Sequence, residues 1–347
     1  MSGLSLRAQQ TIISTIHELE TNRIDYTIAR NYENYPDFGH DLDLFYHAPV
    51  LTFEKIAKKV AAKNSWDIVT YCDHWSKSSI SEHNIDVFRF YKLDTSEYLQ
   101  IDLFRGFLIW GIPFISAEEI LKERKLHSSG FFYRPNGALE NIFRLLQINS
   151  LIGNDSATNK VSRYRERVLR FCDSEKDSLL VCGKKRGLFY IDVALKYLHT
   201  KDYSRFSYYM NKSKKRFLIR YVFKHPINSF RQLIARVGDY YRLFYASPCG
   251  VELNIYASDL SQKKIVESEL NELIKNDFIS SWVEAKNKFM LTVKERRILE
   301  RAGVVIRWVA YQNENILSVN ECESRKEISR MLCKSIIFRH KVIFSKS

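Results

Sequence analysis

Gly39-His40-Asp41-Leu42-Asp43-Leu44 is the stretch that decides the fold of this chain, because it places two acids on a short apolar strand. Side chains alternate between the two faces of a strand, so Asp41 and Asp43 share one face and the leucines share the other. A third acid, Asp102, lies within a second apolar strand at residues 99–104. Neighbouring carboxylates repel one another unless a cation lies between them. The pattern therefore predicts a divalent-metal site built from the three aspartates.

Hydrophobic periodicity around this stretch predicts an α+β protein. The first third of the chain has the pattern of a mixed sheet with flanking helices: helix 6–19, strands 24–29 and 41–46, helix 52–63, and strands 66–72, 86–93 and 98–104. The middle is mostly helical, with candidates at 117–123, 138–151, 160–172, 188–197 and a basic region at 206–245 that Pro226 and Gly238 are expected to interrupt. Strands at 251–256, 278–284 and 304–311 alternate with helices at 260–275 and 293–302, which is typical of a small α/β domain with some parallel pairing. We therefore divide the chain into three regions: a mixed-sheet domain at 1–116, a helical, basic region at 117–246 and a small α/β domain at 247–347.

Composition places the chain among globular proteins. Its 347 residues are 45% hydrophobic, which is enough for two or three domains with cores. The longest apolar run, at 106–115, is half of the ~20 residues that cross a bilayer, so no membrane span is predicted. Residues 1–10 have one Arg and no apolar run, unlike a secretory signal. We expect a cytoplasmic protein, with peripheral membrane contact as an alternative.

The cysteines indicate neither zinc nor disulfides. No C-x-x-C and no paired His spacing accompanies them. We expect all six to be reduced and mostly buried: Cys72, Cys172, Cys182, Cys249, Cys322 and Cys333.

Positive charge is concentrated in the middle of the chain. The net charge is +14, and residues 203–238 contain nine Lys or Arg and no Asp or Glu. Such a block attracts polyanions: nucleic acid, an anionic membrane or phosphate-bearing substrates. A solvated helix face with a core-facing aromatic stripe explains the same pattern, and both interpretations stay open.

Three segments together resemble a known superfamily. They are Ala29-Arg30-Asn31-Tyr32-Glu33-Asn34-Tyr35-Pro36, the following Gly39-His40-Asp41-Leu42-Asp43, and Ile101-Asp102-Leu103. The combination resembles the nucleotidyltransferases of the DNA polymerase β type, and more narrowly the nucleotidyltransferase-like proteins encoded among bacterial capsule and lipopolysaccharide genes. The resemblance covers residues 24–115, about a third of the chain.

The resemblance implies a two-metal site. Asp41 and Asp43 would bridge two Mg²⁺ ions, with Mn²⁺ as the alternative ion, and Asp102 would hold one of them and help to activate the acceptor hydroxyl. Two such ions about 4 Å apart stabilise the attacking and leaving oxygens of a phosphoryl transfer. Carboxylate oxygens suit Mg²⁺ better than His or Cys ligands.

The resemblance also implies that Gly39, His40 and Arg30 contact the nucleotide. Gly39 would let backbone N–H groups approach the phosphates. His40 stands where the superfamily usually has Ser, and its charge depends on pH. Arg30 would neutralise phosphate charge, although a surface ion pair with Glu33 or Asp37 is an equal alternative.

Residues 247–264 have the strand, loop and helix plan of a P-loop unit, without its glycines or its GK[ST] ending. They faintly resemble the thymidylate-kinase-like domains fused to nucleotidyltransferase-like domains in some polysaccharide gene clusters. We expect a degenerate unit with a structural or acceptor-binding role.

Three functions follow as hypotheses. The first is metal-dependent transfer of a nucleotidyl group from a nucleoside triphosphate to a hydroxyl or phosphate acceptor, in surface polysaccharide biosynthesis. The second is LicD-like phosphoryl-alcohol transfer from a CDP-linked donor to a glycan, with CMP instead of pyrophosphate as leaving group. The third is a catalytically inactive binding module that docks on nucleic acid or an anionic membrane through residues 203–238.

Overall fold

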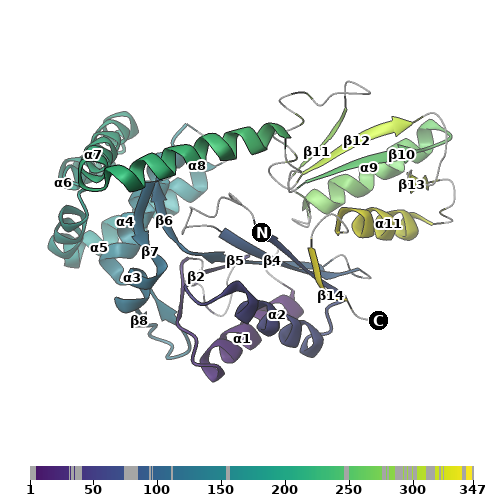
Figure 1. The fold of residues 1–347 in the computed structure, drawn as a ribbon, viewed down its shortest axis with the longest axis horizontal. Coiled ribbons are helices and arrows are strands. Elements are labelled where there is room, and N and C mark those ends of the chain that lie inside the picture. The colour runs from purple at the N-terminus through teal and green to yellow at the C-terminus, as the bar shows by residue number, and fades with distance from the viewer. Residues whose placement is uncertain are drawn as a thin grey trace.

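The structure of the protein is a computed structural model. It describes residues 5–30, 32, 35, 41–73, 85–93, 95, 97–110, 112–153, 157–245, 250–275, 279, 281–285, 292, 295, 299, 303–309, 317–319, 322, 324–337 and 341–345. The α+β class predicted from the sequence is confirmed (Figure 1).

A six-stranded mixed sheet forms the first part of the fold. Its order is β1-β2-β5-β4-β3-β14, in which β2 and β5 are parallel and the other neighbours are antiparallel. The strands are β1 (Tyr26–Ile28), β2 (Asp41–Tyr46), β3 (Ile68–Asp73), β4 (Ile85–Lys92), β5 (Glu97–Phe104) and β14 (Lys341–Ser345). The five strands predicted in this region are present, and β2 has the predicted bounds.

Helices α1 (Leu6–Thr21) and α2 (Val50–Lys63) cover one face of this sheet (Figure 1). The α1 helix begins after Ser5, whose hydroxyl accepts a hydrogen bond from the Ala8 N–H and so caps the helix. Its buried Ala8, Ile12, Ile16 and Leu19 are three or four residues apart, which gives one apolar stripe. That stripe and the apolar face of the sheet form one core beneath the acid-bearing strands.

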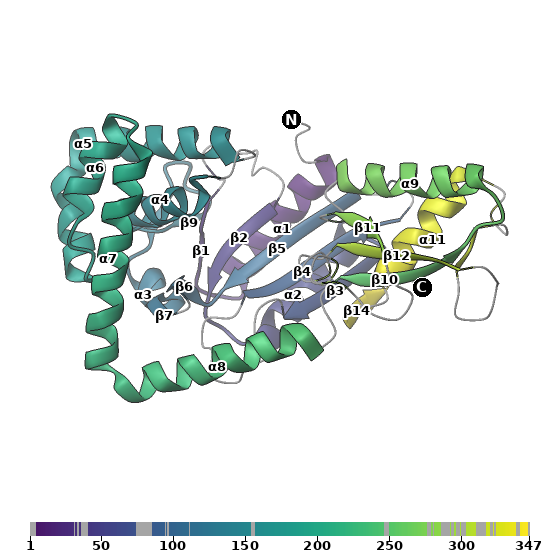
Figure 2. The ribbon, with the colours of Figure 1, turned by 90° about the horizontal axis from the view of Figure 1, so that it is seen from above.

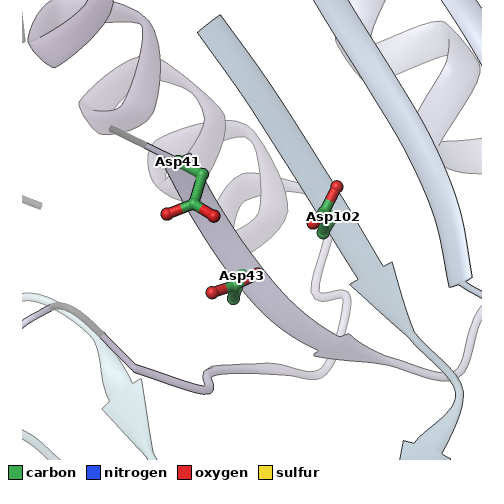
Figure 3. A group of neighbouring side chains, drawn as sticks. All are labelled: Asp41, Asp43 and Asp102. Carbon is green, nitrogen blue, oxygen red and sulfur yellow. The ribbon is translucent and has the colours of Figure 1, made fainter. Parts of the chain in front are cut away.

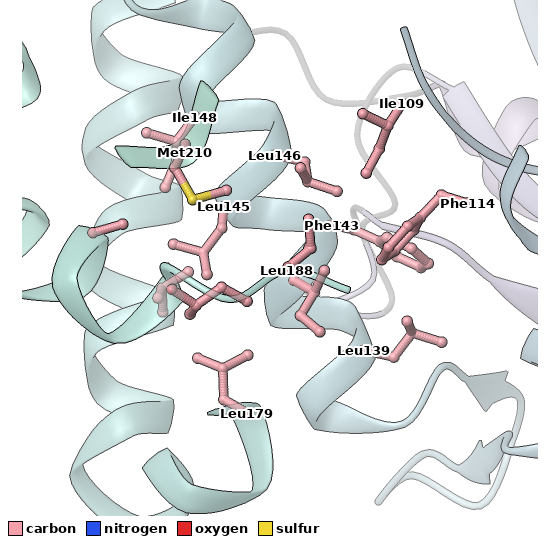
Figure 4. Close-up of a cluster of buried hydrophobic side chains, with 14 of the residues drawn as sticks. Ile109, Phe114, Leu139, Phe143, Leu145, Leu146, Ile148, Leu179, Leu188 and Met210 are labelled. Atoms are coloured by element: carbon pink, nitrogen blue, oxygen red, sulfur yellow. The ribbon is translucent and has the colours of Figure 1, made fainter. Parts of the chain in front are cut away.

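The helical middle of the chain packs around a second core (Figure 4). It contains α3 (Ala117–Lys122), α4 (Gly137–Leu151), α5 (Thr158–Lys185), α6 (Ile191–His199), α7 (Tyr203–Lys224) and α8 (Pro226–Tyr245). Two hairpins precede α4: β6 (Gly106–Ile109) with β7 (Ile112–Ser116), and β8 (Lys125–Leu126) with β9 (Tyr133–Arg134). Phe45, at the end of β2, joins this core and so ties it to the first sheet.

Two expectations for the middle region were wrong. The predicted helix at 160–172 extends to Lys185, through a non-helical residue at Glu175. Gly238 does not interrupt α8, because a glycine inside an exposed helix costs only about 1 kcal/mol. Pro226 does end one helix and begin the next, as expected, because proline is tolerated in a first turn.

The last part of the chain contains a four-stranded sheet of order β11-β12-β10-β13. Its strands are β10 (Val251–Tyr256), β11 (Trp282–Glu284), β12 (Val304–Val309) and β13 (Leu317–Ser318), with helices α9 (Leu260–Lys275) and α11 (Arg325–Ile337). All its pairings are parallel, which confirms the predicted parallel character. Most of the helix predicted at 293–302 lies outside the described residues.

The final strand leaves this region. After α11 the chain returns to the first sheet, where β14 pairs antiparallel with β3 (Figures 1 and 2). Ile68 and Tyr91 of the first sheet also pack into the core of the last part. Residues 341–345 are therefore part of the first sheet, and the division at 116/117 and 246/247 stays a prediction.

The cysteines follow their prediction in part. Cys172, Cys182, Cys322 and Cys333 are free thiols, as expected. Only Cys333 among these four is buried, so the expectation of mostly buried cysteines was wrong for them.

Phe344→Ala tests whether β14 contributes to the stability of the first sheet. Phe344 pairs with Val69 and packs on the core, whereas Val342 of the same strand is 38% exposed. We expect the free energy of unfolding, measured by urea denaturation, to fall by about 2 kcal/mol, below the 3–5 kcal/mol of a fully buried Phe. Val342→Ala is the control and should cost less than about 0.5 kcal/mol. Equal effects of the two changes would show that the strand is not held by this packing.

Candidate metal centre

The three predicted aspartates meet on adjacent strands. In the parallel register of β2 and β5, Asp43 stands opposite Asp102 and Asp41 opposite Gln100. Figure 3 shows Asp41 and Asp43 projecting from β2 beside Asp102 on β5. One carboxylate oxygen of each residue lies within 4.8 Å of the corresponding oxygens of the other two. Period 2 and a parallel register are therefore sufficient to assemble the group.

The acids differ in their exposure. The Asp43 side chain is fully buried and Asp102 is 8% exposed, whereas Asp41 is half-buried at the rim. The Asp43 Oδ1 atom is buried without a hydrogen-bond partner. A buried carboxylate oxygen without a partner is costly, and it points to a group that the protein alone does not supply.

Arg30 is the cation that the chain itself brings to these acids. Its Nε donates to Asp43 Oδ2, and its Nη2 lies 3.8 Å from Asp41 Oδ2. The strand pairing places it there, because the Ala29 N–H donates to the Asp43 carbonyl at 2.8 Å. The sequence analysis did not predict this contact. The predicted phosphate contact of Arg30 is not tested by the structure, and Glu33 and Asp37 lie outside the described residues.

A polar network on β5 orients Asp102. The Gln100 amide donates to Asp102 Oδ1 at 2.8 Å, while its own oxygen accepts from the Tyr98 hydroxyl and, at 3.2 Å, from Arg89 Nε. The sequence analysis missed Tyr98, Gln100 and Arg89. Period 2 was a usable signal for the first two, because residues 98, 100 and 102 share one strand face. Arg89 is the register partner of Gln100 on β4, which no local pattern reveals.

Helix α5 adds two further side chains near the acids. The Lys160 ammonium contributes a favourable charge to Asp43, and Tyr164 lies within electrostatic range of Arg30. Lys160 Nζ stands 5.7 Å from the centre of the Tyr164 ring. Helix α5 therefore brings the Lys160 ammonium and the buried Tyr164 ring from the helical part of the fold toward the site.

Burial and the charges of neighbouring groups shift the pKa values of Asp102, Asp43 and Arg30. Burial, with the charges of Asp43 and Asp41, raises the pKa of Asp102 to about 8. Burial also raises the pKa of Asp43, to about 6, because Arg30 only partly offsets it. Burial lowers the pKa of Arg30, but Asp43 and Asp41 outweigh this effect and raise it above its usual range. Carboxyl groups whose pKa values are raised in this way favour a bound proton or a bound cation.

The donor set fits a hard divalent cation. It offers carboxylate oxygens alone, which Mg²⁺ and Mn²⁺ accept, and the buried Asp43 Oδ1 lacks a partner. The placement of Gly39 and His40 lies outside the described residues, so their nucleotide contacts stay predictions. Among the described residues, no helix is long and apolar enough to span a bilayer.

Comparisons with known proteins give only distant similarities. No protein-family model and no curated protein matches the chain. Among solved structures, an antigenic nucleotidyltransferase-like protein from Paracoccidioides brasiliensis is 14% identical, with a TM-score of 0.32, over 67% of this chain and 94% of its own. JHP933 from Helicobacter pylori is 12% identical, with a TM-score of 0.27, over 66% and 99% of the two chains. These similarities are too distant to assign an activity.

Asp102→Asn tests whether ionisation of the buried acids destabilises the metal-free protein. Because the folded pKa values of Asp43 and Asp102 lie above the ordinary 3.8, the metal-free folded state retains protons that the unfolded chain releases. Its stability must therefore fall as pH rises from 3.8 to about 6 because of Asp43 and from 3.8 to about 8 because of Asp102, and level off above that. The slope is about 1.4 kcal/mol per pH unit for each retained proton. The variant should lose the share that belongs to Asp102 and be more stable than wild type at pH 9. Urea denaturation in EDTA between pH 6 and 9 measures both curves, and parallel curves would contradict the prediction.

Proposed function

We propose that this protein is a divalent-metal-dependent nucleotidyltransferase that moves a nucleotidyl group from a nucleoside triphosphate to a hydroxyl or phosphate acceptor in surface polysaccharide biosynthesis. The observation that carries the proposal is the convergence of the Asp41, Asp43 and Asp102 carboxylates with an unpartnered buried oxygen on Asp43. The sequence resemblance supports the same reaction class.

Each side chain has a role in this proposal. Asp41, Asp43 and Asp102 hold the metal, and Mg²⁺ is the ion we assign. When bound, the metal supplies positive charge that stabilises the charge developing on the transferring phosphoryl group. Gln100 fixes the Asp102 carboxylate through Oδ1, and Oδ2 is the atom we assign to accept the proton of the acceptor. Arg30 is assigned to the phosphates of the donor, together with Gly39 and His40.

Two alternatives share the same acids. LicD-like transfer from a CDP-linked donor would use the same metal site and release CMP instead of pyrophosphate. The other alternative, a catalytically inactive module that docks on nucleic acid or an anionic membrane through residues 203–238, is favoured by one observation: the Arg30 guanidinium already lies against Asp43 and Asp41 and offsets part of their charge.

Asp43→Asn tests the proposed function. We expect Mg²⁺ together with a nucleoside triphosphate to raise the melting temperature of the wild-type protein by several degrees, because a ligand at 100 times its Kd adds about 2.7 kcal/mol to stability. The variant should lose this shift and lower turnover at least about a hundredfold. Thermal melts with a panel of triphosphates and CDP-alcohols, followed by identification of the released pyrophosphate or CMP, separate the two transfer reactions.

The matched control for this experiment is Asp192→Asn. Asp192 is exposed on α6 and pairs only at the surface with Lys176, at 2.8 Å, so its melting shift and turnover should equal those of wild type. If wild type shows no Mg²⁺-dependent shift with any donor, the inactive module replaces both transfer reactions.

A further inference from the structure

A cationic cavity lies at the β8–β9 hairpin, outside the group of carboxylates. Its volume is about 450 Å³, and its walls come from the β8–β9 hairpin, the start of α4 and one face of α5. This volume lies in the range of small-molecule sites, roughly 300–1,000 Å³. Gly137 allows α5 to approach, because a Cβ there would lie 2.9 Å from the Phe171 ring.

Positive charge dominates the walls of the cavity. Two carboxylates, Glu140 and Glu175, stand against five cationic side chains: Lys125, Arg134, Arg144, Arg167 and Arg170. Glu140 is buried and shared by two guanidinium groups, since Arg134 Nη1 lies 3.4 Å from its Oε2 and Arg144 binds its Oε1. One buried charge thus orients two arginines and leaves the cavity with an excess of positive charge.

The cavity and the acidic group share two chain segments, residues 30–32 and helix α5. Tyr32 lines it two residues after Arg30, which binds Asp43. On α5, Arg167 follows Tyr164 by three residues, which is about 4.5 Å along the helix axis. The cavity and the acidic group are therefore built partly from the same two chain segments.

The chemistry of the walls selects a phosphate ester. Arginine binds phosphate in bidentate geometry, and Gly137 brings the start of α4, the positive end of its dipole, to the wall of the cavity. The half-buried His127 and Phe171 rings line the cavity and can contact a sugar or a base. We propose that the cavity binds the phosphate group of a phosphorylated sugar acceptor; this rests on the proposed function and names its substrate class.

Arg167→Gln/Arg170→Gln tests the cavity by titration calorimetry on the full chain. The experiment uses glucose 1-phosphate, glucose and ATP in EDTA. We expect glucose 1-phosphate to bind at least tenfold more tightly than glucose. The double variant should weaken glucose 1-phosphate about tenfold, as loss of a charge-assisted hydrogen bond does. Lys55→Gln/Lys264→Gln removes the same charge from exposed positions on α2 and α9 and should change nothing.

The same titration on Asp43→Asn distinguishes a failure of the cavity proposal from a failure of the metal-site proposal. Retained binding of glucose 1-phosphate in that variant supports the cavity even if the Mg²⁺ experiment fails. Wild-type affinity of the arginine double variant for glucose 1-phosphate would overturn the proposal. Loss of ATP binding alone would also overturn it, since the cavity would then serve the donor.

The end of α7 and the length of α8 carry a separate observation. Their apolar side chains face solvent: Phe223 is 83% exposed, and five residues of α8 are 50% to 69% exposed, namely Ile227, Phe230, Leu233, Ile234 and Val237. At 3.6 residues per turn, these five fall within about a third of the helix circumference. Figures 1 and 2 show α8 running along one side of the molecule, from the helical part toward the four-stranded sheet.

The two interpretations of the basic region apply to different helices. Phe206 and Phe217 of α7 are buried, as a core-facing aromatic stripe requires, but the stripe on α8 faces outward. Exposed cations accompany the stripe, Lys224 at the end of α7 and Arg231 within α8, and no acid occurs between residues 203 and 238. An apolar stripe bordered by cations is the pattern of a helix that lies in the interface of an anionic membrane. Nucleic acid would use the cations and leave the apolar stripe without a partner.

We infer that α8 docks on an anionic bilayer. Phe230→Ser/Leu233→Ser/Val237→Ser tests this by sedimentation with vesicles of phosphatidylcholine alone or with 30% phosphatidylserine. We expect wild type to bind the anionic vesicles at least tenfold more tightly than the neutral ones. The triple variant should lose at least tenfold, since each buried methylene contributes about 0.8 kcal/mol. Leu51→Ser/Leu260→Ser is the control, because both leucines are 67% exposed elsewhere.

Three results would overturn the membrane proposal. The first is equal sedimentation of the triple variant and wild type. The second is salt-sensitive binding of nucleic acid without vesicle binding. The third is a concentration-dependent dimer that the triple variant abolishes while vesicles stay unbound, because a second copy of the chain would then cover α8.

Discussion

Repulsion among three carboxylates is the constraint on which the site depends. The parallel register of β2 and β5 sets Asp43 opposite Asp102, and one carboxylate oxygen of each acid lies within 4.8 Å of those of the other two. The fold tolerates this because Arg30 reaches across from the end of β1 and because a proton is retained at raised pKa. The site therefore needs positive charge in every state, whether guanidinium, proton or metal.

The energy that holds the acids together comes from the apolar side of the same strands. Leu42, Leu44, Ile101 and Leu103 alternate with the acids and are buried under α1 and α2. Each fully buried aliphatic side chain contributes about 1.5–3 kcal/mol, so a few such residues outweigh an unfavourable polar contact. Above the acids, α5 contributes to both the site and the cationic cavity, which makes it the link between the sheet and the helical part.

Local pattern was sufficient for part of this structure. Period 2 predicted β2 with its bounds and the shared face of Asp41 and Asp43, and helical periodicity predicted α9 from Leu260 to Lys275. The predicted placement of Asp102 on a strand next to that of Asp41 and Asp43 was also sufficient to bring the three acids together. Contacts set by tertiary register were beyond such patterns: Arg30 with Asp43, and Arg89 with Gln100. The pairing of β14 with β3 was also beyond local pattern, because the sequence of a five-residue strand does not specify which sheet the strand joins.

That return has a consequence for synthesis. About 270 residues separate β3 from the strand that pairs with its open edge. At 5–20 residues per second, a ribosome needs on the order of tens of seconds to make that stretch. Throughout this time the nascent first sheet has an unpaired edge, which is a template for pairing with other chains. Until β14 has been made, this edge is therefore a place where two nascent chains can pair with each other.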